Sequence, residues 1–126
     1  MTYAEAVELF DRRRTAWLRE DLETYLAMWA DGMTFQSPVH PQPLCGRQEF
    51  GQLVRQSMQM MRPVAFEVHH LAVVGDVILA EWTIAAEHRQ SGQRIEWAGM
   101  SVAEVSEGLI TRWREYWNPA DLAPRS

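Results

Sequence analysis

The sequence predicts an α+β fold in which one curved, mostly antiparallel sheet wraps around three N-terminal helices. In the first half of the chain, most apolar residues recur at helical spacing. After Pro63, runs rich in β-branched and aromatic residues alternate with short turns that contain glycine, a pattern typical of antiparallel strands. With 126 residues and no internal repeat or linker-like segment, the chain 1–126 is expected to form one domain.

Apolar stripes predict the first two helices. Residues from Tyr3 to Leu18 keep helical spacing, with Arg13 on or beside the stripe. The Arg13 stem is expected to run along the apolar surface while its head reaches water, and an inward position as partner of an interior carboxylate is the alternative. Asp21 can cap a second helix, whose stripe Leu22–Trp29 is expected to end near Gly32.

The chain is expected to be extended between the second and third helices. Met33–Gln36 is a short strand candidate. Ser37–Gly46 contains three prolines, which rule out a helix and predict a stiff loop that could close over a cavity mouth. On this loop, His40 is expected to be solvated. A third helix is predicted over Arg47–Met61, because Pro63 prevents its continuation.

Four strands are predicted to follow as two hairpins. The first hairpin pairs Val64–Val74 with Val77–Glu87 through the turn Gly75–Asp76, a strong two-residue hairpin signal. In this register His70 faces Glu81. The same register also gives the pairs Val68 with Thr83 and Phe66 with Ala85.

The second hairpin spans Arg94–Trp117, with Ser106-Glu107-Gly108 as a three-residue loop. This loop predicts the pairs Ser101 with Trp113, Gly99 with Glu115, and Trp97 with Trp117. One face then carries three tryptophans together with Glu115. Burying a charge without a partner is expensive, so Glu115 is paired, protonated or exposed to a wet cavity. A salt bridge to Arg13, or to Arg112 or Arg114 after a one-residue register slip, is the alternative.

Composition excludes several partners. A formal net charge of −5 gives no electrostatic footprint for nucleic acid or for an anionic membrane. The single cysteine, Cys45, permits no internal disulfide, and neither a secretory signal nor a membrane-spanning run is present, so a cytoplasmic protein is expected. His69 and His70 are adjacent on a strand and point to opposite faces, and no known metal-binding spacing occurs. Neither a metal nor a cofactor is therefore expected.

Two carboxylates and one imidazole are the candidates for chemistry. Glu81 and Glu115 are expected at inward positions of different strands, with His70 beside Glu81. Such a set could perform general acid/base catalysis in a cavity. An ordinary cross-strand pair of His70 and Glu81 at the sheet edge is the alternative.

Particular strings resemble a known family. D-L-E-T-Y-L-A-M-W-A-D-G-M-T-F, the P-x-x-G-R loop before the third helix and S-E-G-L-I-T-R-W-R-E-Y-W-N-P resemble the nuclear transport factor two-like superfamily, and within it SnoaL-like proteins and limonene epoxide hydrolases. The resemblance implies a cone-shaped α+β barrel, a deep apolar pocket and a homodimer formed through the sheet. The residues expected to line the pocket are Trp17, Tyr25, Trp29, Ser37, Phe50, Met58, Phe66, Val68, Thr83, Trp97, Gly99, Ser101, Trp113 and Trp117.

The resemblance carries over few catalytic residues. In the epoxide hydrolases, a W-R-D-Y string supplies the aspartate that activates water, and Glu115 occupies that place here. The family's arginine and second aspartate fall on Glu81 and Thr83, so neither is retained. In the ketosteroid isomerases, the base aspartate falls at Ser37 and the oxyanion-hole aspartate near Ser101, so both acids are missing.

The sequence thus favours an enzyme that acts on a small hydrophobic molecule by general acid/base catalysis, through epoxide hydrolysis, cyclisation or isomerisation. Glu115 would be the base, Glu81 the acid, and His70 would tune or relay the proton. The alternative is a non-catalytic ligand-binding or dimerisation domain, favoured if an arginine neutralises Glu115 and closes it off from the cavity. The expected dimer contacts on the outer sheet face are Trp82, Met100 and Tyr116.

Overall fold

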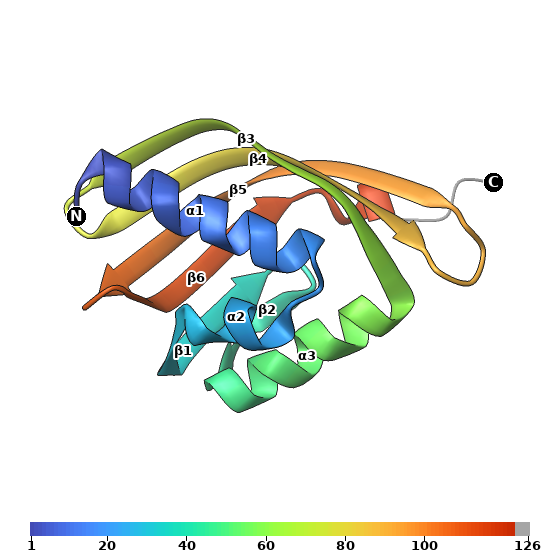
Figure 1. Ribbon diagram of the computed structural model, residues 1–126, viewed down its shortest axis with the longest axis horizontal. Helices are drawn as coiled ribbons and strands as arrows, with labels where there is room; N and C mark the ends of the chain where they lie inside the picture. Colours follow the sequence, from blue (N-terminus) through green and yellow to red (C-terminus); the bar gives the residue numbers. More distant parts are fainter. Residues whose placement is uncertain (123–126) are drawn as a thin grey trace.

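The computed structural model describes residues 1–122 and has the predicted α+β fold (Figure 1). The helices are α1 (Tyr3–Leu18), α2 (Leu22–Ala27) and α3 (Arg47–Met60), with a final 3-10 turn η1 (Pro119–Leu122). The strands are β1 (Trp29–Ser37), β2 (His40–Cys45), β3 (Met61–Val74), β4 (Val77–His88), β5 (Arg94–Ser106) and β6 (Leu109–Trp117).

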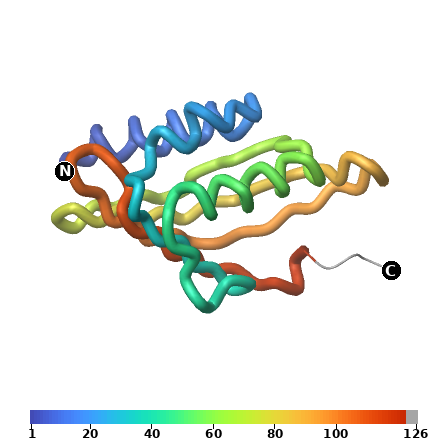
Figure 2. The backbone as a smooth tube through the Cα atoms, turned by 90° about the horizontal axis from the view of Figure 1, so that it is seen from below, coloured from blue at the N-terminus to red at the C-terminus, as the bar shows by residue number. Residues whose placement is uncertain are grey.

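The strands form one six-stranded sheet in the order β2-β1-β6-β5-β4-β3. Only the β1–β6 pair is parallel among these strands, and the other neighbours are antiparallel. The sheet curves around the helices, with α1 packed against β3 and α3 packed against β1, β2 and β3 (Figures 1 and 2). The space enclosed between these helices and the concave side of the sheet contains the core and the candidate site.

Local sequence sets the bounds of the first two helices. The predicted range of α1 is confirmed, and Thr2 and Glu5 form a reciprocal capping box at its start. Asp21 caps α2 as predicted, by accepting from the backbone N–H of Thr24 at 3.2 Å. The prediction that this helix continues to Gly32 is wrong, because β1 begins at Trp29 and pairs with β6. Pairing with a distant strand overrides the local helical pattern.

The predicted loop Ser37–Gly46 is partly a strand. β2 occupies His40–Cys45 and pairs antiparallel with β1. Two of its residues are proline, which an edge strand tolerates because one side of its ladder needs no donors. Because β2 pairs with β1, His40 lies directly opposite Ser37 in the ladder.

The β5–β6 hairpin keeps its predicted faces although its register differs from the prediction. The turn is the two residues Glu107 and Gly108, with φ angles of 51° and 80°, instead of a three-residue loop. A bulge beside Val105 shifts the register again, so that Ser101 pairs with Glu115. The two shifts add to two residues, so beyond the bulge the side chains from Arg112 to Trp117 stay on their predicted faces. Between the turn and the bulge the shift is one residue, and Ile110 faces inward in place of Leu109.

In the β3–β4 hairpin, one pair is as predicted and the others are wrong. His70 pairs with Glu81, as the Gly75–Asp76 turn predicts. A bulge between Val68 and His70 then breaks the register, so Val68 pairs with Trp82. Similarly, Phe66 pairs with Ile84, and Glu67 with Thr83.

Trp82 lies inside the molecule, so its predicted position as an outer dimer contact is wrong. It is 1% exposed, and its indole N–H donates to the Ser101 hydroxyl at 2.8 Å. Met100 and Tyr116, the other two expected contacts, are exposed. Within residues 1–122, none of the helices combines the length and the apolar character needed to cross a bilayer.

Candidate active site

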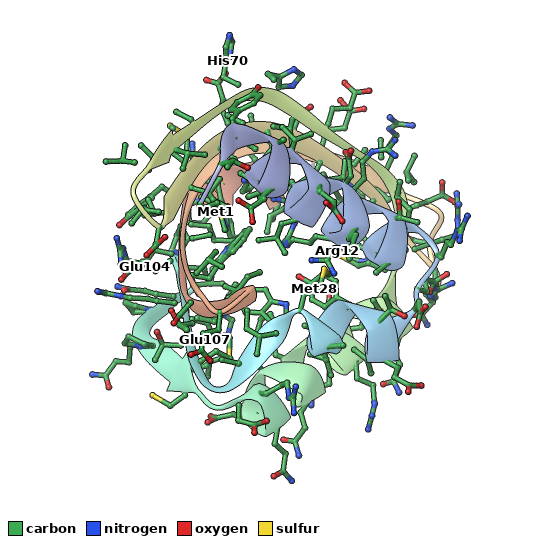
Figure 3. The ribbon with its side chains drawn as sticks, turned by 60° about the vertical axis from the view of Figure 1, so that its left-hand side comes forward. Met1, Arg12, Met28, His70, Glu104 and Glu107 are labelled. Atoms are coloured by element: carbon green, nitrogen blue, oxygen red, sulfur yellow. The ribbon has the colours of Figure 1, made fainter. Side chains whose placement is uncertain are left out.

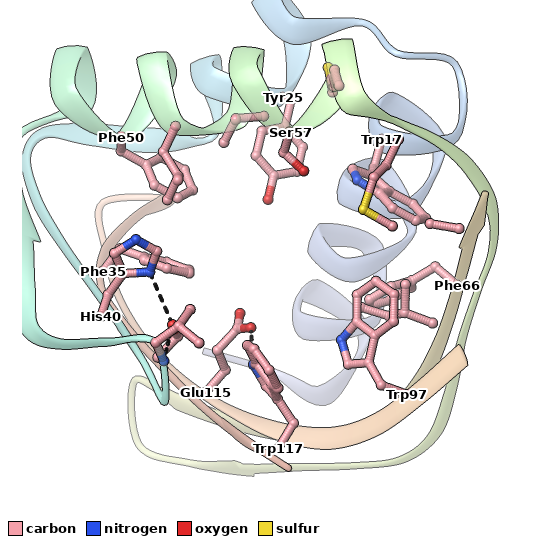
Figure 4. A pocket seen from close by; sticks show the side chains of 18 of the residues that line it. Trp17, Tyr25, Phe35, His40, Phe50, Ser57, Phe66, Trp97, Glu115 and Trp117 are labelled. Carbon is pink, nitrogen blue, oxygen red and sulfur yellow. Dashed lines mark hydrogen bonds between the residues drawn. The ribbon is translucent and has the colours of Figure 1, made fainter. Parts of the chain in front are cut away.

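A cavity of about 210 Å³ lies between the helices and the concave side of the sheet (Figure 4). Its walls are mainly aromatic, with Trp17 from α1, Phe50 from α3, Phe66 from β3, Trp97 from β5 and Trp117 from β6. Six polar or charged side chains interrupt these walls: Arg13, Tyr25, Ser37, His40, Ser57 and Glu115. A small apolar molecule could contact most of this surface.

Eight of the residues expected to line the pocket do line this cavity: Trp17, Tyr25, Ser37, Phe50, Met58, Phe66, Trp97 and Trp117. Trp29 and Trp113 do not, because they pack at tilted angles against each other and against other core rings and are 0% and 1% exposed. Gly99 and Ser101 lie behind the wall, beside Trp82.

The remaining two expected pocket residues lie elsewhere on the molecule. Val68 borders a surface depression beside α1. Thr83 is hydrogen-bonded to His69 on an exposed part of the sheet. For Thr83 the bulge in β3 explains the error, since it changes which residues of the hairpin lie opposite each other. Val68 pairs with the inward Trp82 but lies beside α1 instead of the cavity.

Glu115 lies on the cavity wall, held between two indoles. Trp113, Glu115 and Trp117 alternate along β6, so all three side chains project to the same side of the sheet. The Trp113 N–H donates to Glu115 Oε1 at 2.8 Å, and the Trp117 N–H donates to Oε2 at 2.7 Å. Figure 4 shows the carboxylate directed into the cavity.

Burial raises the pKa of Glu115 above its ordinary value. The Arg13 guanidinium, the two indole donors and His40 offset part of that rise. A carboxylate with these neighbours can accept a proton and hold it, as a general base must.

Arg13 also lines the cavity, so the expectation that its head reaches water is wrong. The side chain is 9% exposed, and the guanidinium carbon lies 4.4 Å from the Trp113 ring centre, 5.2 Å from Phe66 and 5.5 Å from Tyr25. Among the residues described, Arg13 forms no salt bridge to Glu115 or to any other carboxylate. It influences Glu115 through the electric field across the cavity.

The other expected partners of Glu115 are also engaged elsewhere. Arg112 and Arg114 both pair with Glu104, at 3.4 Å and 3.0 Å, on the opposite face of the hairpin. Glu115 therefore does not move to the face of Arg112 and Arg114, as a net one-residue register slip would require.

His40 and Ser37 form a second polar group at the cavity wall. The Ser37 hydroxyl lies 3.2 Å from His40 Nδ1 and accepts from the backbone N–H of Val39 at 3.3 Å. If the hydroxyl donates to Nδ1, the His40 proton is on Nε2. The expectation that His40 is solvated is therefore wrong: its ring is partly buried and borders the cavity.

Tyr25 faces Glu115 from the opposite wall (Figure 4). Burial raises the pKa of its hydroxyl; Arg13 reduces this rise and Glu115 adds to it. Tyr25 therefore stays a neutral phenol, able to donate to a ligand oxygen.

The structure does not bring Glu81 and His70 to the cavity. They form an exposed pair, with His70 Nδ1 at 2.8 Å from Glu81 Oε1 and with 84% and 50% of their side chains exposed. Figure 3 shows His70 pointing away from the molecule. The expectation that Glu81 faces inward is wrong, because even-numbered residues of β4 such as Trp82 and Ile84 fill the inner face.

Sequence reasoning missed the position of His40 and favoured the wrong orientation for Arg13. No local signal fixes either one. His40 reaches the wall because β2 pairs with β1, and Arg13 is enclosed by rings from three other elements. Within the described part of the chain, no three His, Cys, Asp or Glu side chains cluster in a way that could hold a metal ion.

Comparisons with known proteins agree with this fold. The sequence model of the SnoaL-like domain matches residues 10–113. A Bacillus subtilis protein provisionally named an isomerase has a TM-score of 0.85 at 20% identity, with 96% of this chain and 92% of that chain covered. An LEH-like epoxide hydrolase from Mycobacterium tuberculosis has a TM-score of 0.80 at 24% identity, with 94% and 86% covered.

A protein from Xanthomonas campestris pv. campestris, provisionally named a polyketide cyclase, has a TM-score of 0.78 at 21% identity, with 94% of each chain covered. At such identities the likeness shows a shared fold. The search of curated proteins found no match. Because the family model covers most of the sequence, and the sheet and helices agree with it, the chain belongs to the SnoaL-like domain family of the nuclear transport factor two-like superfamily.

Proposed function

We propose that this protein is an enzyme that moves a proton within a small, largely apolar substrate, in an isomerisation or a cyclisation. The observation that carries the proposal is the position of Glu115. Its carboxylate borders the cavity, is held by two indole N–H groups and forms no salt bridge among the residues described. A structural ion pair would instead be closed off from the cavity by its partner.

In the proposed reaction, Glu115 takes a proton from a carbon beside a carbonyl group. The C–H bond breaks, its electron pair forms a carbon–carbon double bond, and the carbonyl oxygen gains a negative charge. Glu115 then returns the proton to another carbon. In a cyclisation, the enolate carbon instead attacks a second carbonyl group in the same molecule, a C–C bond forms as the C=O π bond breaks, and the resulting alkoxide takes the proton back from Glu115. The tryptophan walls exclude water and strengthen the electrostatic interactions inside the site.

A proton transfer fits the site better than epoxide hydrolysis does. Opening an epoxide with water needs a base for the water and a separate acid for the leaving oxygen. Glu81, the expected acid, lies on the exposed face of the sheet. The Tyr25 phenol in the cavity can donate a hydrogen bond, but burial raises its pKa and makes it a weak acid. Proton transfer within one molecule needs only one carboxylate, and Glu115 is the only carboxylate among the described residues that line the cavity.

Hydrogen exchange at carbon tests this proposal without knowledge of the product. Cyclic ketones are incubated with the protein in D₂O, and deuterium incorporation beside the carbonyl is followed by NMR. Glu115→Gln keeps the shape of the side chain and removes its basicity, so the exchange rate should fall about 10²–10⁴-fold. The matched control is Glu81→Gln, the same change on the exposed face, which should leave the rate unchanged.

The outcomes separate the candidate functions. Exchange that persists in Glu115→Gln would eliminate the assigned base. Opening of a small cyclic epoxide by the wild type, without exchange in any ketone, would favour a hydrolase. Binding of these compounds without exchange or opening would favour a ligand-binding domain.

A further inference from the structure

Arg13 is a buried cation whose aromatic neighbours compensate part of its charge but leave its Nε without a hydrogen-bond acceptor. The faces of Tyr25, Phe66 and Trp113 surround the guanidinium at 4.4–5.5 Å. Aromatic faces attract a cation, yet they do not replace the oxygen acceptors that a guanidinium prefers. Its Nε is buried and has no hydrogen-bond partner among the residues described.

Burying a guanidinium with an unpaired N–H costs folding free energy unless a ligand or another group supplies an acceptor. Buried polar groups in proteins are nearly always hydrogen-bonded, and buried charges are nearly always paired. Arg13 has no carboxylate at salt-bridge distance in the described chain, and it borders a cavity that is open to ligands. The missing partner is therefore expected to arrive with the ligand.

We propose that Arg13 determines substrate specificity by binding an anionic oxygen of an otherwise apolar ligand, with a carboxylate as its simplest form. The planar guanidinium matches a carboxylate in shape and in the direction of its donors. The aromatic walls around it bind the apolar body of the same molecule. The inference rests on the proposed function only in using the same cavity, since it names the substrate class.

The arrangement of charges around the cavity supports this orientation. Glu115 on β6, Tyr25 on α2 and His40 on β2 are the other titratable groups that line the cavity with Arg13. Arg13 lies over the Trp113 ring, whose N–H donates to Glu115, so a ligand whose anionic oxygen binds Arg13 also lies beside the carboxylate. The same guanidinium would stabilise the negative oxygen that forms when Glu115 removes a proton.

A matched pair of ligands tests the proposal. Cyclohexanecarboxylate and cyclohexanecarboxamide have nearly the same shape and differ in charge. Binding is followed by calorimetry and by the fluorescence of Trp17, Trp97 and Trp117, which line the cavity. The wild type should bind the carboxylate at least tenfold more tightly, equivalent to about 1.4 kcal/mol. Equal affinities, or no binding of either compound, would overturn the proposal.

Variants assign the preference to Arg13. Arg13→Met removes the charge and suits an aromatic surrounding, and it should abolish the tenfold preference while the carboxamide still binds. Arg13→Lys retains the charge without the planar fork and should keep part of the preference. Arg12→Met is the control, because Arg12 is an exposed neighbour on the same helix. If Arg13→Met does not fold, as judged by circular dichroism, the wild-type and lysine measurements still decide.

Failure of this inference can be distinguished from failure of the proposed function. Glu115→Gln should lose hydrogen exchange and keep the carboxylate preference. If the preference survives in a folded Arg13→Met variant, the inference is wrong, whatever the exchange assay shows. If Glu115→Gln still catalyses exchange while Arg13→Met loses the preference, the anion site stands and the assigned base is wrong.

Discussion

Replacing Trp117 with phenylalanine should make Glu115 a weaker acid. The indole N–H of Trp117 donates to Glu115 Oε2 at 2.7 Å, and phenylalanine keeps an aromatic wall without a donor. The lost bond stabilises the ionised carboxylate more than the neutral acid, so its removal raises the pKa of Glu115 further.

The size of the effect follows from the type of bond. A hydrogen bond to a charged group contributes about 1.5–3 kcal/mol net. Trp113 continues to donate to Oε1 at 2.8 Å, so one of the two indole hydrogen bonds to the carboxylate remains. Because 1.4 kcal/mol is a factor of ten, the acid dissociation constant of Glu115 should fall by about tenfold or more. Water entering the space left by the indole would keep the effect near the lower end.

The measurement is a pH titration of the side-chain carboxyl carbons by ¹³C NMR, with the Glu115 signal identified by its absence in Glu115→Gln. The matched control is Trp97→Phe, since Trp97 lines the same cavity and no hydrogen bond joins it to Glu115. A midpoint that moves equally in both variants would refute the specific role of the Trp117 donor. A wild-type midpoint at or below the ordinary value of about 4.5 would refute the argument from burial.

Two further predictions concern stability. Gly99→Ala should destabilise the fold by about 1–3 kcal/mol in urea titrations, because a Cβ there would lie 2.6 Å from the Tyr116 carbonyl oxygen and 2.8 Å from the Trp82 ring. The control is Gly32→Ala, whose Cβ meets nothing within 4 Å. Equal stabilities of the two variants would contradict this reasoning. Folding raises the pKa of Glu115, so the folded state binds more protons than the unfolded state at pH values between the two pKa values. The stability of the wild type relative to Glu115→Gln should therefore fall as pH rises through that window, by up to about 1.4 kcal/mol per pH unit. A rise in stability would mean that the fold stabilises the carboxyl group in its charged form.

Local sequence determined most of the elements. The capping box of Thr2 and Glu5 starts α1, Asp21 starts α2, and the turn Gly75–Asp76 joins β3 to β4. Alternation along β6 was sufficient to place Glu115 on the inner face. These features depend on residues within a few positions of each other, whose geometry the backbone fixes.

The bulges were decided by tertiary packing. The bulge in β3 changes which β4 residues Phe66 and Val68 face, so the prediction that put Glu81 inside and Trp82 outside was wrong. An inward Trp82 is buried against Gly99 and bonds to Ser101, whereas an inward Glu81 would be an unpaired buried charge. The free energy of burying a large indole favours the observed register, and no spacing in the sequence records it.

The polar groups of the site also depend on the assembled fold. Sequence alone determined that Glu115 would lie among tryptophans, because its neighbours Trp113 and Trp117 are two residues away on the same strand. Only the tertiary structure decided that Arg13 is enclosed by Tyr25, Phe66 and Trp113, rings from three separate elements. Periodicity gives the direction of a side chain from its own strand or helix, whereas the surroundings that set its charge state come from segments brought together by folding.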